Sequence, residues 1–290
     1  RMFLSLLLCS SVSISRGGRA WSCSSVSSCS RPTRIYMQFS EAELSNAVGS
    51  LQTLALHAID WPQLKNLLAR TAHLSHKDWA RTESAAVELE AVLGSPSGPN
   101  SANFAHIFER VLADGNWAAA TAAAAKRPEG ERPWVVLVTG LNGIRKTTSI
   151  YQPWFKTVLQ QALGRQFIGG TDELPGGADS FFRQLDYMIA TLANQDFRRL
   201  YEEHADNVES YAATKASIFT RYRTYSEMLG CLLIKEAQRE RLNVIVETSG
   251  RDIGMYTYID HLFPDETSEY RKLVINFGIN DIVFAERSVD

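Results

Sequence analysis

The sequence predicts an α/β fold, in which a parallel sheet carries helices on both faces and follows an all-helical N-terminal region. The run "WVVLVTG" at 134–140 is apolar almost throughout, which is typical of a strand buried on both faces of a parallel sheet. Two later runs, "NVIVETSG" at 243–250 and "KLVINFGIND" at 272–281, are also rich in apolar residues, and long helical patterns separate them from the first. Strands that alternate with helices predict a parallel sheet.

The first forty residues differ in composition from the remainder. They are rich in Ser and Arg, and the first acidic residue of the chain is Glu41. This composition predicts a transit peptide that directs the protein to a plastid or a mitochondrion. The short apolar run at 3–8 favours a secretory signal instead, and a disordered tail on a cytoplasmic protein is a third interpretation. Only Cys231 lies outside this segment, so we expect no intramolecular disulfide in the body of the protein.

Residues 41–126 form the predicted helical region. Ser40 followed by Glu43 fits a capping box, in which each side chain satisfies the other residue's backbone N–H. Asp60 is expected to cap the next helix, with Pro62 in its first turn. The Gly, Pro and Ser residues at 94–101 predict a linker before two further helices.

Residues 133–290 form the predicted α/β domain. We expect a helix after the first strand, disturbed at Pro153, and a second strand within "RQFIGGTDE" at 165–173. A long helical stretch at 178–241 is expected to break near Asp206. The chain stops within what reads as the start of a helix, so we expect the domain to lack part of its natural C-terminus.

The overall composition narrows the class of protein. The chain has 290 residues, is 45% hydrophobic and has a formal net charge of -2, which suits one or two globular domains. This charge balance gives no footprint of nucleic-acid binding. No apolar run approaches the roughly 20 residues that a membrane-spanning helix requires.

The stretch "GLNGIRKTT" at 140–148 closely resembles a phosphate-binding loop, which reads Gly, four residues, Gly, Lys, then Ser or Thr. A buried strand is expected before it and a helix after it, so that backbone N–H groups at the start of the helix would bind phosphate. Lys146 would reach the terminal phosphates of ATP, and the Thr147 hydroxyl would bind Mg²⁺. The full predicted nucleotide-binding set is Gly140, Asn142, Gly143, Arg145, Lys146, Thr147 and Thr148.

Arg145 occupies the place where the pattern has its second Gly. Gly is used where the backbone needs an unusual angle or close contact with a ligand, so a side chain here either points outward or crowds the nucleotide. Its positive charge could instead contact a phosphate oxygen. We favour the contact with phosphate.

The region from 134 onward resembles the zeta-toxin-like P-loop kinases, which phosphorylate small molecules. The resemblance rests on "VTGLNGIRKTT", on the expected strand that ends in Asp172, and on "NVIVETSGRD". It covers a little over half of the chain and implies a P-loop kinase-like sheet with ATP and Mg²⁺ as cofactors. It implies nothing about residues 1–130.

The resemblance also implies roles for single residues. Asp172 would be the base that accepts the proton of the acceptor hydroxyl, with Glu173 as its rival and a capping carboxylate as the alternative interpretation. Glu247 and Thr248 would contact substrate or metal, and Arg251 would bind substrate or phosphate. In this family, arginines of a lid stabilise the transferring phosphoryl group, and the matching candidate here is Arg287.

Three charged residues beyond 172 allow two interpretations. Asp179, Arg183 and Asp186 could line the acceptor pocket, or they could lie on a helix surface. The sequence favours the helix surface, because they fall in the expected helical stretch.

The leading hypothesis is a kinase that transfers the γ-phosphate of ATP to a hydroxyl of a small molecule. One alternative is a nucleotide-binding module without transfer activity, which would act through its N-terminal helices. Another is an NTPase, for which water is the acceptor.

Overall fold

The structure is a computed structural model of the whole chain. It describes residues 2–7, 40–54, 59–71, 79–94, 101–204, 206–250, 254–279 and 283. The linker expected at 94–101 and the helix expected at the end of the chain lie almost wholly outside these residues, as does most of the first forty.

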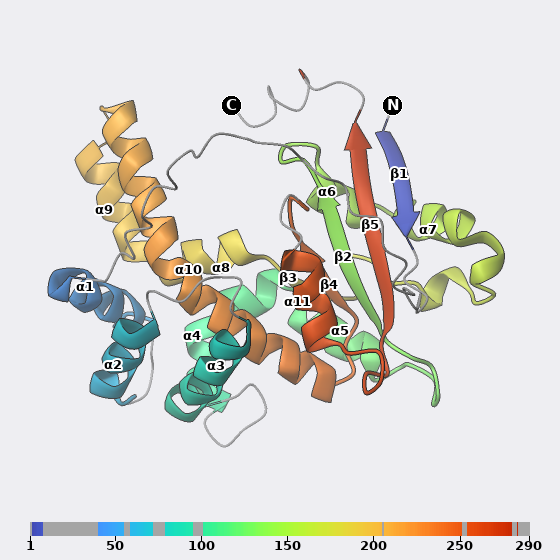
Figure 1. Cartoon of the computed structure of the whole chain (residues 1–290), viewed down its shortest axis with the longest axis horizontal. Helices are drawn as coiled ribbons and strands as arrows, with labels where there is room; N and C mark the ends of the chain where they lie inside the picture. The colour runs from blue at the N-terminus through green and yellow to red at the C-terminus, as the bar shows by residue number, and fades with distance from the viewer. Residues whose placement is uncertain are drawn as a thin grey trace, which may run out of the picture.

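A sheet with four parallel strands forms the centre of the molecule (Figure 1). The parallel strands are β2 (Trp134–Gly140), β3 (Phe181–Arg183), β4 (Val244–Glu247) and β5 (Arg271–Ile279). Their order is β5-β2-β4-β3, and β1 (Met2–Leu7) pairs with β5 in the antiparallel direction at the edge. The expected strands at 134–140, 243–250 and 272–281 are confirmed.

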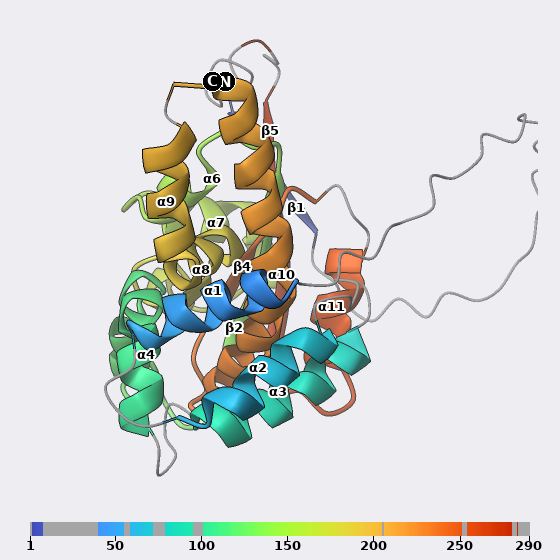
Figure 2. The same ribbon diagram turned by 90° about the vertical axis from the view of Figure 1, so that its left-hand side faces the viewer.

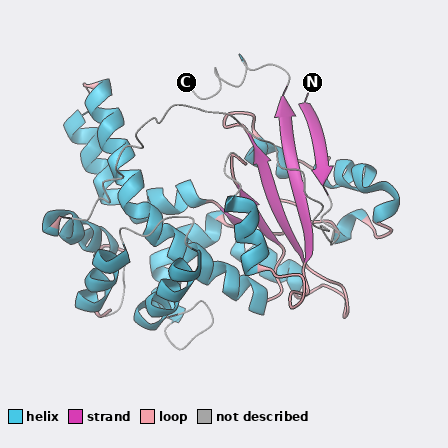
Figure 3. Cartoon of the chain, viewed as in Figure 1, coloured by secondary structure: helices cyan, strands magenta, loops and turns pink. Residues whose placement is uncertain are grey.

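Helices cover both faces of the sheet, as the sequence predicts. Along β2, Val135 and Leu137 join one apolar cluster, whereas Val136 and Val138 join another, because successive side chains of a strand point to opposite faces. The face of Val136 packs against α6 (Lys146–Ile150) and α7 (Phe155–Leu163). The other face packs against α8 (Leu185–Leu192), α10 (Val208–Arg239) and α11 (Gly254–Leu262). Figure 3 shows this layering by element type.

The N-terminal helices pack against the same core. They are α1 (Glu41–Gln52), α2 (Trp61–Thr71), α3 (Trp79–Leu93), α4 (Ser101–Asp114) and α5 (Trp117–Ala124). Figures 1 and 2 show α3 lying along α10, which also runs beside α9 (Asn194–His204). A single buried cluster includes Leu64 of α2, Phe108 of α4 and Val135 of β2. The helical region and the sheet therefore share one hydrophobic core.

Local signals in the sequence place several helix ends correctly. The Ser40–Glu43 capping box forms in both directions, with Ser40 N–H donating to Glu43 Oε2 at 2.8 Å. Asp60 Oδ1 accepts a hydrogen bond from Gln63 N–H at 2.9 Å, and α2 carries Pro62 at its second position. Pro153 falls in the gap between α6 and α7, because proline cannot continue the ladder of a helix.

The predicted second strand is wrong. Residues 165–173 contain two short 3-10 helices, Gly164–Gln166 and Thr171–Glu173, and Ile168 between them is 99% exposed. The strand that pairs with β4 is β3, eight residues beyond the end of that stretch, in what the sequence suggests is the start of a helix. Phe181 and Phe182 of β3 are both buried, one toward each apolar cluster.

No helix in the described part of the chain is both long enough and apolar enough to cross a bilayer. The long helix α10 carries charged residues along its length, including Arg221, Glu227 and Lys235.

Candidate active site

The stretch 140–148 connects the carboxyl end of β2 to α6, as the phosphate-loop pattern requires. Gly140 has φ 137°, and a Cβ at this position would lie 2.5 Å from the carbonyl oxygen of Phe277 on β5. Only Gly fits this strand end without a shift of the neighbouring strand. Gly143 also has a positive φ, 80°, so both glycines of the stretch adopt backbone angles that other residues rarely take.

Arg145 adopts the backbone conformation that the pattern assigns to Gly. Its φ and ψ are 60° and 36°, which is the left-handed helical region, and it lies directly before the first residue of α6. The backbone therefore has the angles that a Gly would accept freely, although the residue is Arg. The side chain of Arg145 is exposed and makes no capping hydrogen bond.

The side chain of Lys146 is buried and contacts the backbone of the loop. Its side chain is only 4% exposed, and Nζ donates hydrogen bonds to the carbonyl oxygens of Gly140 at 3.0 Å and Leu141 at 2.9 Å. The ammonium group thus lies against the start of the loop, next to where the backbone N–H groups of the loop would hold an anion.

Glu247 joins this loop to the second predicted motif. It ends β4, which pairs with β2 so that Glu247 lies opposite Val138, close to the start of the loop. The Thr147 hydroxyl donates to Glu247 Oε2 at 2.6 Å, and Lys146 Nζ lies 3.5 Å from Glu247 Oε1. Both contacts form because the carboxyl ends of parallel strands meet at one edge of the sheet.

A cavity of about 430 Å³ opens beside these residues. Of the residues predicted from sequence, Asn142, Thr147, Glu247 and Thr248 line it. Arg183 and Asp186 line it too, so the helix surface that the sequence favours for them is wrong for Arg183, which ends β3 and is only 1% exposed. The other lining residues come from the start of α8, the middle of α10, the turn after β4 and the start of α11: Gln184, Leu185, Tyr187, Arg223, Glu227, Ser249 and Met255. A space of this size suits a small molecule.

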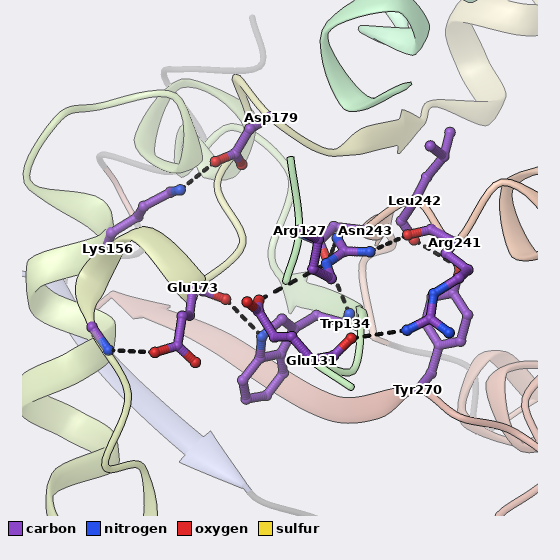
Figure 4. Close-up of polar contacts among 11 residues, drawn as sticks. Arg127, Glu131, Trp134, Lys156, Glu173, Asp179, Arg241, Leu242, Asn243 and Tyr270 are labelled. Carbon is purple, nitrogen blue, oxygen red and sulfur yellow. Dashed lines mark hydrogen bonds and ion pairs between the residues drawn. The ribbon is translucent and has the colours of Figure 1, made fainter. Parts of the chain in front are cut away.

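Asp172 does not lie at this cavity. It is exposed in a 3-10 helix, and its neighbour Glu173 accepts a hydrogen bond at its backbone oxygen from the Trp134 indole at 2.9 Å (Figure 4). Trp134 begins β2, whereas the 140–148 loop starts at Gly140, where β2 ends. A strand rises about 3.3 Å per residue, so the two ends lie roughly 20 Å apart. Asp172 and Glu173 are therefore at the opposite end of the sheet from Lys146.

Asp186 is an acidic residue that does lie at this cavity. It lies in the first turn of α8, three residues after the end of β3, and it lines the cavity with Thr147 and Glu247. Its carboxylate has no hydrogen bond or ion pair with other residues that the structure describes. The sequence feature that marks this position is the apolar pair Phe181–Phe182, which forms most of a very short strand and is followed closely by Asp186.

The remaining predicted residues are not among the described residues that line the cavity. Thr148 is exposed on α6, on the same short helix as Thr147. Arg251 and Arg287 lie outside the residues that the structure describes. Asp179, which could also have lined the acceptor pocket, forms an ion pair with Lys156 of α7, also visible in Figure 4.

The oxygens of Thr147 and Glu247 fit a magnesium ion. Mg²⁺ is usually held by one or two protein oxygens together with phosphate oxygens and water, not by a complete protein cage. No cluster of three or more His, Cys, Asp or Glu side chains that could hold a metal occurs among the described residues, so a metal here would depend on a bound phosphate.

Comparison of the chain with family profiles, with curated proteins and with solved structures gave no match.

Replacement of Arg145 tests whether its side chain contacts phosphate. Gly and Asn both tolerate the left-handed conformation, so Arg145→Gly and Arg145→Asn should fold normally and melt at or slightly above the wild-type temperature. If the guanidinium contacts phosphate, both variants should bind Mg·ATP more weakly by roughly 1 to 3 kcal/mol in calorimetry. Arg145→Lys, which keeps the charge, should lose less. Tighter binding by Arg145→Gly would show that Arg145 only crowds the loop.

Proposed function

We propose that this protein is a P-loop kinase that binds Mg·ATP at the 140–148 loop and transfers the γ-phosphoryl group to a hydroxyl of a small molecule. The observation that carries the proposal is the contact of Thr147 and Lys146 with Glu247. It joins the loop to the carboxyl end of the neighbouring parallel strand, where α/β proteins of this kind bind their ligands.

The loop supplies the phosphate-binding part of this proposal. The backbone of residues 141–145 turns around the site, with positive φ angles at Gly143 and Arg145. Such turns point successive N–H groups at one anion. Lys146 adds a mobile charge, because its ammonium group can exchange the two loop carbonyls for phosphate oxygens.

The carboxylate of Glu247 and the hydroxyl of Thr147 would hold Mg²⁺ beside the phosphates. The bound ion would neutralise negative charge on the β- and γ-phosphates. In the structure the Thr147 hydroxyl donates a hydrogen bond to Glu247 Oε2, which holds the two oxygens next to each other.

Asp186 is the proposed base in place of Asp172. Its carboxylate would accept the proton of the acceptor hydroxyl as that oxygen attacks the γ-phosphorus, while the bond from the γ-phosphorus to the bridging oxygen breaks and ADP leaves. Phosphoryl transfer depends mainly on position and charge, so an exposed carboxylate on the cavity wall, with no hydrogen bond or ion pair to the described residues, suits this role.

A nucleotide-binding module without transfer activity remains the second candidate, and one observation favours it. Arg145 keeps the left-handed backbone angles of the pattern at a cost of roughly 1 to 2 kcal/mol for a residue other than Gly, and its exposed side chain adds bulk beside the loop where the pattern has none.

ATP consumption in the presence of acceptors separates these candidates. Purified protein should consume Mg·ATP faster when a defined mixture of sugars, polyols and nucleosides is added, and mass spectrometry should show a phosphorylated product. Consumption without any acceptor would indicate an NTPase. ATP binding without consumption under either condition would favour the module without transfer activity.

A further inference from the structure

A buried ion pair lies in the wall of the cavity. Arg183 ends β3 and Glu227 lies near the middle of α10, and both side chains are only 1% exposed. Arg183 Nη2 donates a hydrogen bond to Glu227 Oε2. Both residues line the same cavity as Thr147 and Glu247.

The surroundings of Arg183 hold its guanidinium group in one place. It stacks 5.2 Å from the centre of the Tyr258 ring of α11, and on another side it packs against the backbone of α10 at Gly230. A Cβ at Gly230 would lie 2.5 Å from Arg183 Nε and 2.9 Å from Nη2, so the guanidinium occupies the space that a side chain would need. Although burial lowers the pKa of Arg183, the Tyr258 phenol and the Glu227 carboxylate outweigh it and hold that pKa above its usual range.

The same ion pair is expected to contribute little to the free energy of unfolding. Arg183 Nε and Glu227 Oε1 are buried and have no hydrogen-bond partner among the described residues. A buried ion pair offsets the cost of removing two charges from water only when hydrogen bonds satisfy its remaining atoms, and apolar replacements of both partners are often neutral or stabilising. The pair therefore calls for an explanation other than stability.

The position of the Arg183–Glu227 pair in the chain explains its presence. Arg183 begins the segment 183–187, which forms one wall of the cavity and carries Asp186. β3 has only three residues, so its ladder with β4 gives this wall little support. We propose that the Arg183–Glu227 pair is a positioning element that fixes this segment, and with it Asp186, against α10. The role assigned to Asp186 rests on the proposed function, whereas the anchoring of the segment does not.

The double variant Arg183→Met with Glu227→Leu tests both halves. It removes both charges and keeps similar volumes, so we expect it to melt at or above the wild-type temperature. Hydrogen exchange measured by mass spectrometry should become roughly tenfold faster in peptides covering 181–188 and stay unchanged in α7. Transfer should fall by roughly tenfold or more in kcat, with ATP affinity within about twofold, because a displacement of about 1 Å is sufficient for such a loss.

Two further variants guard the interpretation. Glu227→Gln keeps the shape of the side chain and its hydrogen bond with Arg183. It replaces the double variant if that variant does not fold. It should show the same faster exchange at 181–188 and the same fall in kcat, each to a smaller degree. Glu236→Gln is the matched control, because Glu236 is also a buried carboxylate of α10, pairs with Arg239 at 2.6 Å and does not line the cavity. It should change neither the exchange at 181–188 nor kcat.

The outcomes are distinct. Unchanged exchange at 181–188 in the double variant would overturn the anchoring role. Faster exchange with wild-type kcat would overturn the link to Asp186. If the wild-type protein consumes no ATP, the proposed function fails, and the exchange experiment still decides whether the pair anchors the segment.

Discussion

Lys146→Ala should abolish measurable transfer and weaken Mg·ATP binding by roughly 10- to 100-fold. The ammonium group is a buried charge that contacts the start of the loop, and a hydrogen bond to a charged group contributes roughly 1.5 to 3 kcal/mol. Calorimetry with ATP measures the affinity, and ATP consumption with acceptors measures the transfer.

The side chain of Lys146 is buried and holds two loop carbonyls, so its removal could also loosen the loop. Lys146→Met keeps most of the stem and tests the charge alone; it should lose ATP affinity to a similar extent while melting near the wild-type temperature. Lys215→Ala, at an exposed position of α10 away from the cavity, is the matched control and should bind ATP as the wild type does. Wild-type affinity in Lys146→Met would refute the phosphate-loop assignment.

Asp186→Asn should reduce kcat by roughly 10² or more and leave ATP affinity nearly unchanged. Asn keeps the shape of the side chain but cannot accept the proton of the acceptor hydroxyl, and the loss of a general base commonly has this scale. Single-turnover kinetics with saturating Mg·ATP would isolate the chemical step from binding.

Asp172→Asn provides the decisive comparison. Asp172 is the residue that the family resemblance indicates, and the structure places it at the amino end of β2, far from Lys146. The Asp172→Asn variant should therefore transfer phosphate at wild-type rates. A large loss in Asp172→Asn together with normal rates in Asp186→Asn would mean that the segment 164–187 is arranged differently in the active protein.

The sheet could be predicted from sequence wherever its strands carry continuous apolar runs. β2, β4 and β5 have such runs, and their parallel arrangement follows from the helices between them. β3 contributes only three residues, of which the last is Arg183, so no window of sequence distinguishes it from a helix start. The expected strand at 165–173 fails because only Phe167 packs toward the sheet, whereas Ile168 is 99% exposed and a 3-10 helix lies on either side.

The residues of the candidate site could likewise be predicted only where they lie next to a strand with a continuous apolar run. Lys146, Thr147 and Glu247 could be placed together in advance, because each follows a strand that the sequence reveals. For Asp186 the sequence leaves two interpretations open, since its place at the cavity depends on β3. The partnership of Arg183 with Glu227 was also beyond prediction, because it joins residues 44 apart on elements whose packing is set by the whole core.

The strand order has a consequence for how the protein is made. β2 lies in the middle of the sheet, yet both of its neighbours, β4 and β5, follow it late in the chain. Thr147 and its partner Glu247 are 100 residues apart, and at about 5 to 20 residues per second a ribosome needs roughly 5 to 20 s to synthesise that interval. During this time the apolar β2 has neither of its neighbouring strands to pair with, and Thr147 lacks its partner Glu247. Nascent chains of this protein should therefore depend on early helices, or on chaperones, to shield β2 until β4 leaves the ribosome.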